Sequence, residues 1–351
     1  MSIGTSASCL RVVAVATGLR AHTASAAATR QATQHTDRHS APTRAGGWII
    51  GETVQVSVYS EPIDSAAGYL TSPGSLGVHW RHGVPPGGED TESTIQVCRH
   101  DEHTFVLRQS KMVSYEAPFL YLLLGNSRAL LLDTGDVLEP SRCPVRETVD
   151  RLITAWLAVR LRMSYPLVVA HSHGHADHVA GDQQFAGRPD TTVVGRDRQS
   201  VADFFGFTRW PDQVVSLDLG GRVLSITGTP GHHDSSISVH DPWTGFLLTG
   251  DTVYPGRLYV QDMAAFIDSI DRMLWLAESR GVRRVMGAHI EMSRTPGQDY
   301  PRGTTYQPQE APLEMTTDQL RAVRDAAASV AGSPGVHLFD DFVIVNGSSG
   351  Q

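Results

Sequence analysis

Short apolar runs separated by polar and glycine-containing turns dominate the first half of the main body of the chain. Runs rich in β-branched and aromatic residues are typical of strands. On this basis we predict strands at 95–97, 104–108, 119–124 and 129–132. Over 145–157 the apolar residues recur every three or four positions, the spacing of an amphipathic helix. The run Leu167-Val168-Val169-Ala170 then predicts a buried strand, which ends at a group of histidines.

The second half of the chain repeats this plan. We predict its strands at 192–194, 223–227, 237–239, 246–248 and 284–286. Apolar residues on one face indicate a helix over about 261–279. After a stretch rich in Pro, Gly and Tyr at 294–313, Thr316 or Thr317 predicts a helix cap, and a last strand follows near 336–345. Strands that alternate with helices in two similar halves predict an α/β layered fold.

Composition divides the 351 residues into three regions. Residues 1–46 are rich in Ala, Thr, Ser and Arg without hydrophobic periodicity, so they cannot bury enough apolar surface to offset the entropy of ordering. We expect a disordered or targeting leader there, or a start codon assigned too early. Residues 47–93 are expected to form an extension that packs on the main domain, 94–351, in which 294–313 is a candidate lid. The predicted location is the cytoplasm, with export or organelle targeting by the leader left open.

Charge and cysteine content exclude several classes of protein. Asp and Glu outnumber Lys and Arg by 37 to 29, a balance unsuited to phosphate backbones, so we predict no nucleic-acid partner. No apolar run approaches the roughly 20 residues of a membrane-spanning helix, so we predict no membrane partner. The three cysteines lie far apart, which indicates neither a disulfide framework nor a thiolate zinc site. A small-molecule substrate is the partner that remains.

The 16 histidines are the unusual feature of the composition, and four of them lie within 171–178. Directly after the strand predicted at 167–170, the chain reads His173-Gly174-His175-Ala176-Asp177-His178. Imidazoles and a carboxylate are ligands that suit zinc and also iron or manganese. One octapeptide rarely supplies more than three ligands to a single ion, so two neighbouring metals would use all four donors.

Further donors follow the strands predicted for the second half. His232, Asp251 and His289 each come after an apolar run and a small residue, at successive intervals of 59, 19 and 38 residues counted from His173. With five dispersed motifs over about residues 94–290, this order resembles the metallo-β-lactamase superfamily of hydrolases, and specifically its glyoxalase II and lactonase-like branch. The resemblance implies a four-layer αββα sandwich.

The resemblance also implies a role for each motif residue. It implies that one metal is held by His173, His175 and His232, that a second is held by Asp177, His178 and His289, and that Asp251 bridges them. The expected cofactor is a pair of divalent metal ions, with zinc favoured and iron or manganese as alternatives. Asp133 matches the first family motif, whose carboxylate orients a ligand histidine without binding metal.

Hydrolysis is the chemistry that such a centre implies. Two divalent cations roughly 3.5 to 4 Å apart can share a water and lower its pKa toward neutrality. The bridging hydroxide would attack an ester, thioester or lactone carbonyl, while one metal stabilises the developing oxyanion. Asp177 is expected to help relay the proton to the leaving group. Tyr254, three residues after Asp251, looks like the tyrosine with which lactonase-type members hydrogen-bond the substrate.

Departures from the family pattern narrow the expected activity. Asp251 stands where many true β-lactamases have a cysteine ligand, which disfavours β-lactams as the main substrates. The roughly 60 residues after His289 predict one helix and one strand, less than the helical domain with which glyoxalase II grips glutathione, so a glutathione thioester is not favoured. Two rival functions stay open: a mononuclear iron dioxygenase that acts on a persulfide, and a non-catalytic binding protein.

Several residues near the motifs have ordinary structural interpretations. His171 and His233 flank ligands but match no ligand position, so we expect them behind the metal site. Aromatic residues after a short helix are expected to pack in the core rather than line a substrate pocket: Phe204, Phe205, Phe207 and Trp210. Tyr300 and Tyr306 lie in the candidate lid, for which a plain surface loop is the alternative. Residues 80–89 either wrap the main domain or mediate a homodimer.

Overall fold

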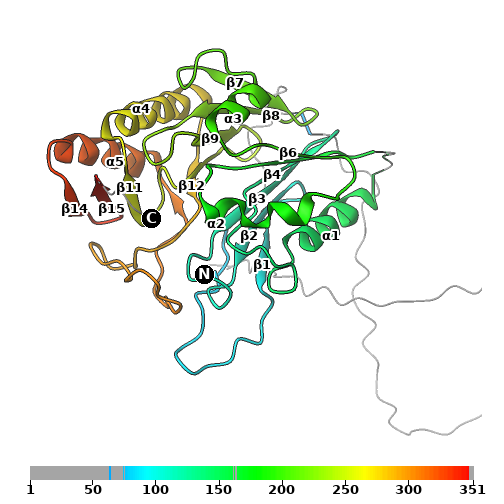
Figure 1. The fold of residues 1–351 in the computed structure, drawn as a ribbon, viewed down its shortest axis with the longest axis horizontal. Coiled ribbons are helices and arrows are strands. Elements are labelled where there is room, and N and C mark those ends of the chain that lie inside the picture. Colours follow the sequence, from blue (N-terminus) through cyan, green and yellow to red (C-terminus); the bar gives the residue numbers. More distant parts are fainter. Residues whose placement is uncertain (1–62, 65–73, 75, 161, 163, 348–351) are drawn as a thin grey trace, which may run out of the picture. The chain divides into compact units, whose positions relative to one another are not determined.

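The computed structural model describes residues 63–64, 74, 76–160, 162 and 164–347. The predicted leader and the first part of the predicted extension lie outside the described residues. Two six-stranded sheets, a sheet of three strands and the helices around them make up the described part (Figure 1). Within it, no helix combines the length and the apolar character needed to span a bilayer.

The first sheet takes all its strands from the first half of the chain, in sequence order. They are β1 (Ile95–Arg99), β2 (Thr104–Gln109), β3 (Phe119–Leu124), β4 (Ala129–Leu132), β5 (Leu167–Ala170) and β6 (Thr191–Val193). Strands β1 to β4 pair antiparallel, whereas β4, β5 and β6 pair parallel because helical crossovers connect them. The sequence prediction of this sheet is confirmed, with β6 starting one residue earlier than expected.

The second sheet has the order β13-β12-β10-β9-β8-β7. Its strands are β7 (Val214–Asp218), β8 (Val223–Gly228), β9 (Ile237–Asp241), β10 (Phe246–Gly250), β12 (Arg284–Gly287) and β13 (Glu314–Met315). The sequence analysis did not predict β7 or β13. Both are edge strands, β7 buries only Val215 fully, and β13 has two residues, so neither has a strong apolar pattern.

The third sheet consists of β11 (Arg257–Val260), β15 (Val343–Asn346) and β14 (Gly335–Leu338). The single strand predicted at 336–345 is therefore wrong, because β14 and β15 form an antiparallel hairpin. Phe339 N–H donates to Phe342 O (2.9 Å) across the turn, where the polar pair Asp340 and Asp341 interrupts the apolar run. The region after His289 thus has one helix and three short strands, where one strand was expected.

The described helices lie around the two large sheets. They are α1 (Val145–Leu157), α2 (Ala176–Val179) with a 3₁₀ turn after it (Ala180–Phe185), α3 (Arg198–Phe205), α4 (Met263–Arg280) and α5 (Thr317–Val330). The side chain of Thr316 caps α5 in a reciprocal pair with Gln319, as one of the two predicted caps. Helix α4 begins after Asp262, which accepts from Ala265 N–H, and ends at Gly281, whose φ of 72° favours glycine.

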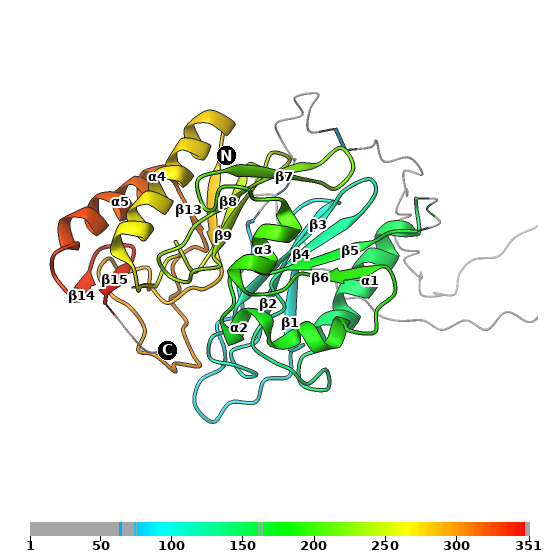
Figure 2. The ribbon, with the colours of Figure 1, turned by 45° about the horizontal axis from the view of Figure 1, so that its top comes forward.

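Three apolar clusters define four layers. The central cluster fills the space between the sheets, with β3 and β4 facing β8, β9 and β10. A second cluster packs α1 on the outer face of the first sheet, and a third packs α4 and α5 on the outer face of the second. Figure 2 shows α4 and α5 side by side, with the two sheets between them and α1. The predicted αββα sandwich is confirmed.

A buried ion pair lies where strand ends of the two large sheets meet. Arg222 and Asp241 are both fully buried, and two guanidinium nitrogens meet the two carboxylate oxygens at 3.0 and 2.6 Å. The same guanidinium donates across to the first sheet, to His103 O (2.8 Å) and to Thr104 Oγ1 (2.9 Å). The second sheet is therefore anchored on the first by a charged group that has no access to water.

The described part of the predicted extension packs on this core. Leu76, Val78 and Trp80 lie against the central cluster, and the Trp80 ring meets Phe119 of β3 edge-on at 4.8 Å. Arg81 N–H donates to the Gln96 side chain on β1 (2.7 Å). All of these contacts are made with the main domain of the same chain, as the first of the two alternatives expects. The homodimer alternative for residues 80–89 stays a prediction.

Candidate metal centre

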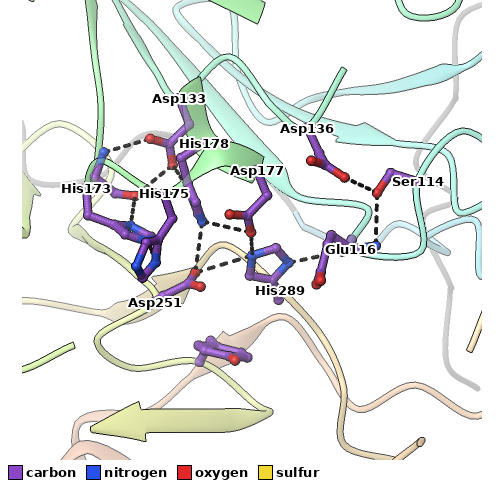
Figure 3. A network of polar contacts seen from close by, with 12 residues as sticks. Ser114, Glu116, Asp133, Asp136, His173, His175, Asp177, His178, Asp251 and His289 are labelled. Carbon is purple, nitrogen blue, oxygen red and sulfur yellow. Dashed lines mark hydrogen bonds and ion pairs between the residues drawn. The ribbon is translucent and has the colours of Figure 1, made fainter. Parts of the chain in front are cut away.

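The predicted donors come from both large sheets and lie at the ends of their strands. The loop after β5 supplies His173 and His175, and the short helix α2 that follows supplies Asp177 and His178. From the second sheet, His232 follows β8, Asp251 follows β10 and His289 follows β12. Figure 3 shows the donors of the two sheets turned toward one another. All seven predicted donors therefore lie in one cluster, in two groups.

The first group is formed by His173, His175 and His232. Nδ1 of His175 lies 2.9 Å from Nε2 of His173 and 3.0 Å from Nε2 of His232, and the last two nitrogens are 3.2 Å apart. Burial lowers the pKa of all three imidazoles, that of His175 to about 4, so they are neutral near pH 7. Three neutral rings that converge at this distance present the nitrogen set that zinc binds.

The second group contains Asp177, His178, Asp251 and His289. Nε2 of His289 lies 3.3 Å from Oδ2 of Asp177 and 3.3 Å from Oδ1 of Asp251. Nε2 of His178 lies at 3.3 and 3.4 Å from the same two oxygens. In the described residues, His178 Nε2 and Asp251 Oδ1 are buried without a hydrogen-bond partner. Buried polar atoms need a partner, and a cation among these four donors would supply it.

Asp251 lies between the two groups. Its Oδ1 faces His178 and His289, whereas its Oδ2 lies 4.0 Å from Nε2 of His232 in the first group. Its side chain is only 5% exposed, so neither oxygen is well hydrated. A carboxylate with one oxygen toward each of two nitrogen-rich groups has the geometry of a bridging ligand.

Contacts on the outer nitrogens fix which imidazole nitrogen faces inward. His232 Nδ1–H donates to Tyr259 O (2.8 Å), and His289 Nδ1–H donates to Glu116 O (3.0 Å). His178 Nδ1 contacts Oδ2 of Asp133 at 3.0 Å. A carbonyl or carboxylate acceptor requires the proton on Nδ1, so Nε2, inside the cluster, is the nitrogen left to bind a metal. This is the arrangement expected of metal-binding histidines.

Negative charge dominates the second group. Burial alone would lower the pKa of His289, but the carboxylates of Asp251 and Asp177 raise it to about 10. Asp177, Asp251 and Asp133 likewise raise the pKa of His178 well above its usual value against the effect of burial. A potential that holds protons on two buried imidazoles also attracts divalent cations, which would replace those protons.

Asp133 lies behind the ligands. It accepts from Ser172 N–H (2.6 Å) and Ser172 Oγ–H (2.9 Å) through its two oxygens, and Oδ2 also receives the His178 contact. Its φ of 69° is left-handed, a conformation that Asp adopts more readily than most residues. The residue thus stands where a carboxylate can orient His178 from outside the cluster.

Comparison with known proteins identifies the family. Residues 117–289, which include all seven donors, match the family model described as the metallo-beta-lactamase superfamily. The chain belongs to the metallo-β-lactamase superfamily. A hydroxyacylglutathione hydrolase of Thermosynechococcus vestitus is 31% identical over 131 residues, which are 34% of this chain and 48% of that protein. A hydroxyacylglutathione hydrolase of Cyanothece is 27% identical over 240 residues, 58% of this chain and 90% of that protein.

A relative with a different name has similar coverage. An acyl-coenzyme A thioesterase of Gallus gallus is 23% identical over 210 residues, which are 49% of this chain and 72% of that protein. The matched part of the chain spans about half the length of the Thermosynechococcus relative and most of the length of the other two. The metallo-β-lactamase superfamily is therefore the level at which these relatives agree.

Tyr254, for which the resemblance implies a contact with substrate, is placed differently from the metal donors. It is 2% exposed, and its hydroxyl donates to Arg257 O (2.5 Å) and lies 3.2 Å from Oε2 of Glu291. Its ring, not its hydroxyl, approaches His289, with the ring centres 5.6 Å apart. The predicted hydrogen bond to substrate would require the hydroxyl to leave Arg257, so this role stays a prediction.

The other residues near the superfamily motifs have structural contacts. His171 Nε2 contacts Asp182 (2.8 Å), and His233 Nδ1 contacts Ser235 Oγ (3.0 Å), both outside the two donor groups. Three of the four aromatic residues after β6 pack in or on the central cluster: Phe205, Phe207 and Trp210. Phe204 is 37% exposed. These aromatic residues therefore fit the core interpretation better than the pocket interpretation.

Sequence reasoning missed two residues that orient the ligands. Tyr259 and Glu116 act through their backbone carbonyls, which hold His232 and His289. Every residue carries the same backbone carbonyl, so no side-chain pattern could identify them. Only the fold brings β11 beside the loop after β8, and the loop before β3 beside the end of β12.

Proposed function

We propose that this chain is a metal-dependent hydrolase that cleaves an ester, thioester or lactone bond. The observation that carries the proposal is the convergence of seven donors in two groups, with Asp251 between them. A single ion takes three or four protein ligands in a catalytic site, so seven donors favour two ions over one. The arrangement also disfavours the mononuclear iron dioxygenase as the rival function.

The donor set determines which residues would hold the cofactor. His173, His175 and His232 would hold one divalent ion, and Asp177, His178 and His289 the other, with Asp251 shared. Two bound divalent ions, for which zinc is the favoured identity, supply Lewis-acid polarisation of a carbonyl and a water of lowered pKa. The protein's part is to orient the donors, and the acceptors Asp133, Glu116 and Tyr259 do so from outside.

Asp177 is the residue best placed to move a proton. Its Oδ2 faces His178 and His289, yet its side chain is 17% exposed, compared with 5% for Asp251. A substrate at the centre could therefore reach this carboxylate and not the buried one. We assign to Asp177 the acceptance of the proton released during attack and its return to the leaving group.

The names of the relatives suggest where to begin the search for a substrate. One relative is called a thioesterase and two are called hydrolases of an acylated glutathione, so acylated thiols are the first candidates. Esters and lactones follow. A small-molecule substrate, without a nucleic-acid or membrane partner, is part of the proposal.

The first experiment is elemental mass spectrometry of the purified full chain without added metal. About two divalent ions per chain are expected, and a panel of thioesters, esters and lactones then tests hydrolysis. In Asp251→Asn we expect fewer ions per chain and at least a hundredfold loss of turnover on any active substrate. Asp325→Asn, in which an 81% exposed carboxylate far along α5 is changed, is the matched control.

Other outcomes would overturn this proposal in identifiable ways. One iron per chain with oxygen consumption in the presence of a persulfide would establish the dioxygenase. Absence of metal after reconstitution, together with unchanged ligand binding in Asp251→Asn, would establish a non-catalytic binding protein.

A further inference from the structure

Lys111, in the loop after β2, is the only lysine in the chain and is 3% exposed. Its ammonium donates to Tyr115 O at 3.1 Å. Burial lowers its pKa to about 8, so the side chain is still mostly protonated at neutral pH. A buried charge costs free energy unless its contacts offset that cost, so the contacts of Lys111 need an explanation.

The loop that Lys111 holds carries an acceptor of the metal centre. Tyr115 is followed by Glu116, whose carbonyl accepts the Nδ1–H bond of His289 (Figure 3). The next residue, Ala117, has a φ of 44°, which an alanine adopts only where surrounding contacts hold it. The direction of the Glu116 carbonyl therefore depends on the bonds that fix this loop, and the Lys111 bond lies one residue away.

A second buried cation, Arg108, is linked to His289 through the neighbouring residues Phe119 and Ala288. Arg108 on β2 lies 4.9 Å over the ring of Phe119, and Phe119 N–H donates to Ala288 O (2.8 Å), directly before His289. Arg108 forms a two-pronged ion pair with Glu310, at 2.6 and 2.7 Å, and Glu310 also lies 4.0 Å from the Lys111 ammonium. One carboxylate therefore contacts both cations, Arg108 closely and Lys111 at the limit of an ion pair.

Glu310 belongs to the segment 294–313, for which the sequence predicted a lid or a surface loop. The segment is joined to β2 by this buried ion pair and to the extension by Gln307 N–H, which donates to His82 O (2.8 Å). The position of this segment is thus linked, through Glu310 and Lys111, to the loop that orients His289.

We propose that Lys111 is a positioning residue for His289. Together with Arg108 and Glu310, it couples the position of segment 294–313 to the donor group that contains His289. This inference rests on the metal binding proposed above. Loss of a partner behind a ligand histidine typically lowers metal affinity 10- to 100-fold. His289 belongs to only one donor group, so the effect falls on one of the two ions.

The test measures the affinity of the full chain for each of two zinc ions by competition with a chromogenic chelator. Lys111→Met keeps the apolar stem and removes the donor; we expect one ion to bind about tenfold more weakly and the other to be unchanged. Lys111→Arg keeps a donor and the charge and should restore most of the affinity. Arg160→Met removes a partly buried cation that contacts Trp156 and Glu102, and should change neither affinity.

Two results would overturn the inference. Unchanged affinity for both ions in Lys111→Met, with a lower unfolding temperature, would assign the lysine a purely structural role, and equal weakening of both ions would do the same. If Lys111→Met does not fold, Glu310→Gln replaces it, because Gln has nearly the same shape as Glu. This variant must then bind one zinc ion more weakly and the other unchanged. A wild-type chain that binds no zinc would instead reject the metal centre itself.

Discussion

The chemistry of each ligand histidine is decided by what its outer nitrogen contacts. His232 and His289 use main-chain carbonyls, whereas His178 uses the carboxylate of Asp133. A carboxylate increases the electron density on the inner nitrogen more than a carbonyl does, so His178 is the strongest donor of the three. The sequence identified Asp133 because a side chain is visible in a motif, and it could not identify the carbonyls.

Asp133→Asn tests this contact with little change in shape. Asn also adopts a left-handed φ readily, so the backbone at 69° should persist. We expect the ion held with His178 to bind about 10- to 100-fold more weakly, measured by chelator competition. Asp182→Asn is the control, because Asp182 contacts a histidine, His171, that belongs to neither donor group. Equal affinities in the two variants would contradict the assigned role.

Tyr254→Phe separates a structural from a catalytic hydroxyl. Because the hydroxyl donates to Arg257 O, we expect the free energy of unfolding in urea to fall by about 1 kcal/mol, with metal content unchanged. Turnover should fall less than tenfold if that bond persists during the reaction. A larger fall in kcat at unchanged stability would show that the hydroxyl turns toward the substrate, as the family resemblance implies.

Secondary-structure elements were predictable where both faces of a strand or one face of a helix are buried. β3, β4 and β5 are buried throughout, and their bounds match the sequence prediction at both ends. β11 was missed because it alternates half-buried and buried residues over only four positions, and β7 because only Val215 of its five residues is buried. β14 is almost entirely exposed, so its apolar residues reflect pairing with β15 and not burial.

The ion pair between the sheets makes a prediction at this scale. Asp241→Asn leaves the buried guanidinium of Arg222 without its counter-charge, and we expect a loss of about 3 to 5 kcal/mol in the free energy of unfolding. Arg222→Met combined with Asp241→Asn should cost less than the sum of the two single changes, because no unpaired charge remains. Urea unfolding of the three variants gives the coupling; additive losses would mean that the two groups act independently.

A buried histidine in the second sheet predicts how stability depends on pH. His240 on β9 is 1% exposed, neither ring nitrogen has a hydrogen-bond partner among the described residues, and burial lowers its pKa to about 4. Because the unfolded chain binds a proton near pH 6.5 and the folded chain does not until about pH 4, stability falls as the pH drops through this range, by about 3 kcal/mol in all.

His240→Leu tests that pH dependence. The variant has no imidazole to protonate, so its free energy of unfolding should fall by less than that of the wild type between about pH 7 and pH 4. The comparison is made on metal-free protein, so that protonation of the metal donors contributes equally to both chains. Parallel curves for the two proteins would mean that His240 accepts a proton without cost.

At the scale of the molecule, the metal donors join its two halves. Four of them lie in the loop and the short helix α2 that follow β5 of the first sheet, and three lie just after strand ends of the second. Ions held there stabilise the folded chain by about 4 kcal/mol each at a free concentration a thousandfold above the dissociation constant. Removal of metal with EDTA should therefore lower the unfolding temperature by roughly 10 °C or more. EDTA presaturated with zinc is the control, and an equal shift there would exclude a metal effect.

Local patterns predicted most of the strands and helices, and the resemblance to the superfamily implied the αββα architecture and the seven residues that the structure brings together in two groups. What the sequence could not predict is how distant segments meet. Glu310 pairs with Arg108, 202 residues away, and nothing near either residue in the chain indicates the other. The third sheet has the same origin, since β11 pairs with β15 across a stretch of chain that contains α4 and α5.

No strand pairing in the described chain joins the first large sheet to the second, and the connection between them runs through the short stretch from α3 to β7. A polypeptide cut in that stretch would yield two pieces, each with its own hydrogen-bonded sheet intact. What would bring them together again is the apolar layer between the sheets, the hydrogen bonds from Arg222 to the first sheet, and any metal ions bound by donors from both pieces. Cut in this way, the molecule could serve as a split protein, in which reassembly of the two pieces would report the availability of metal.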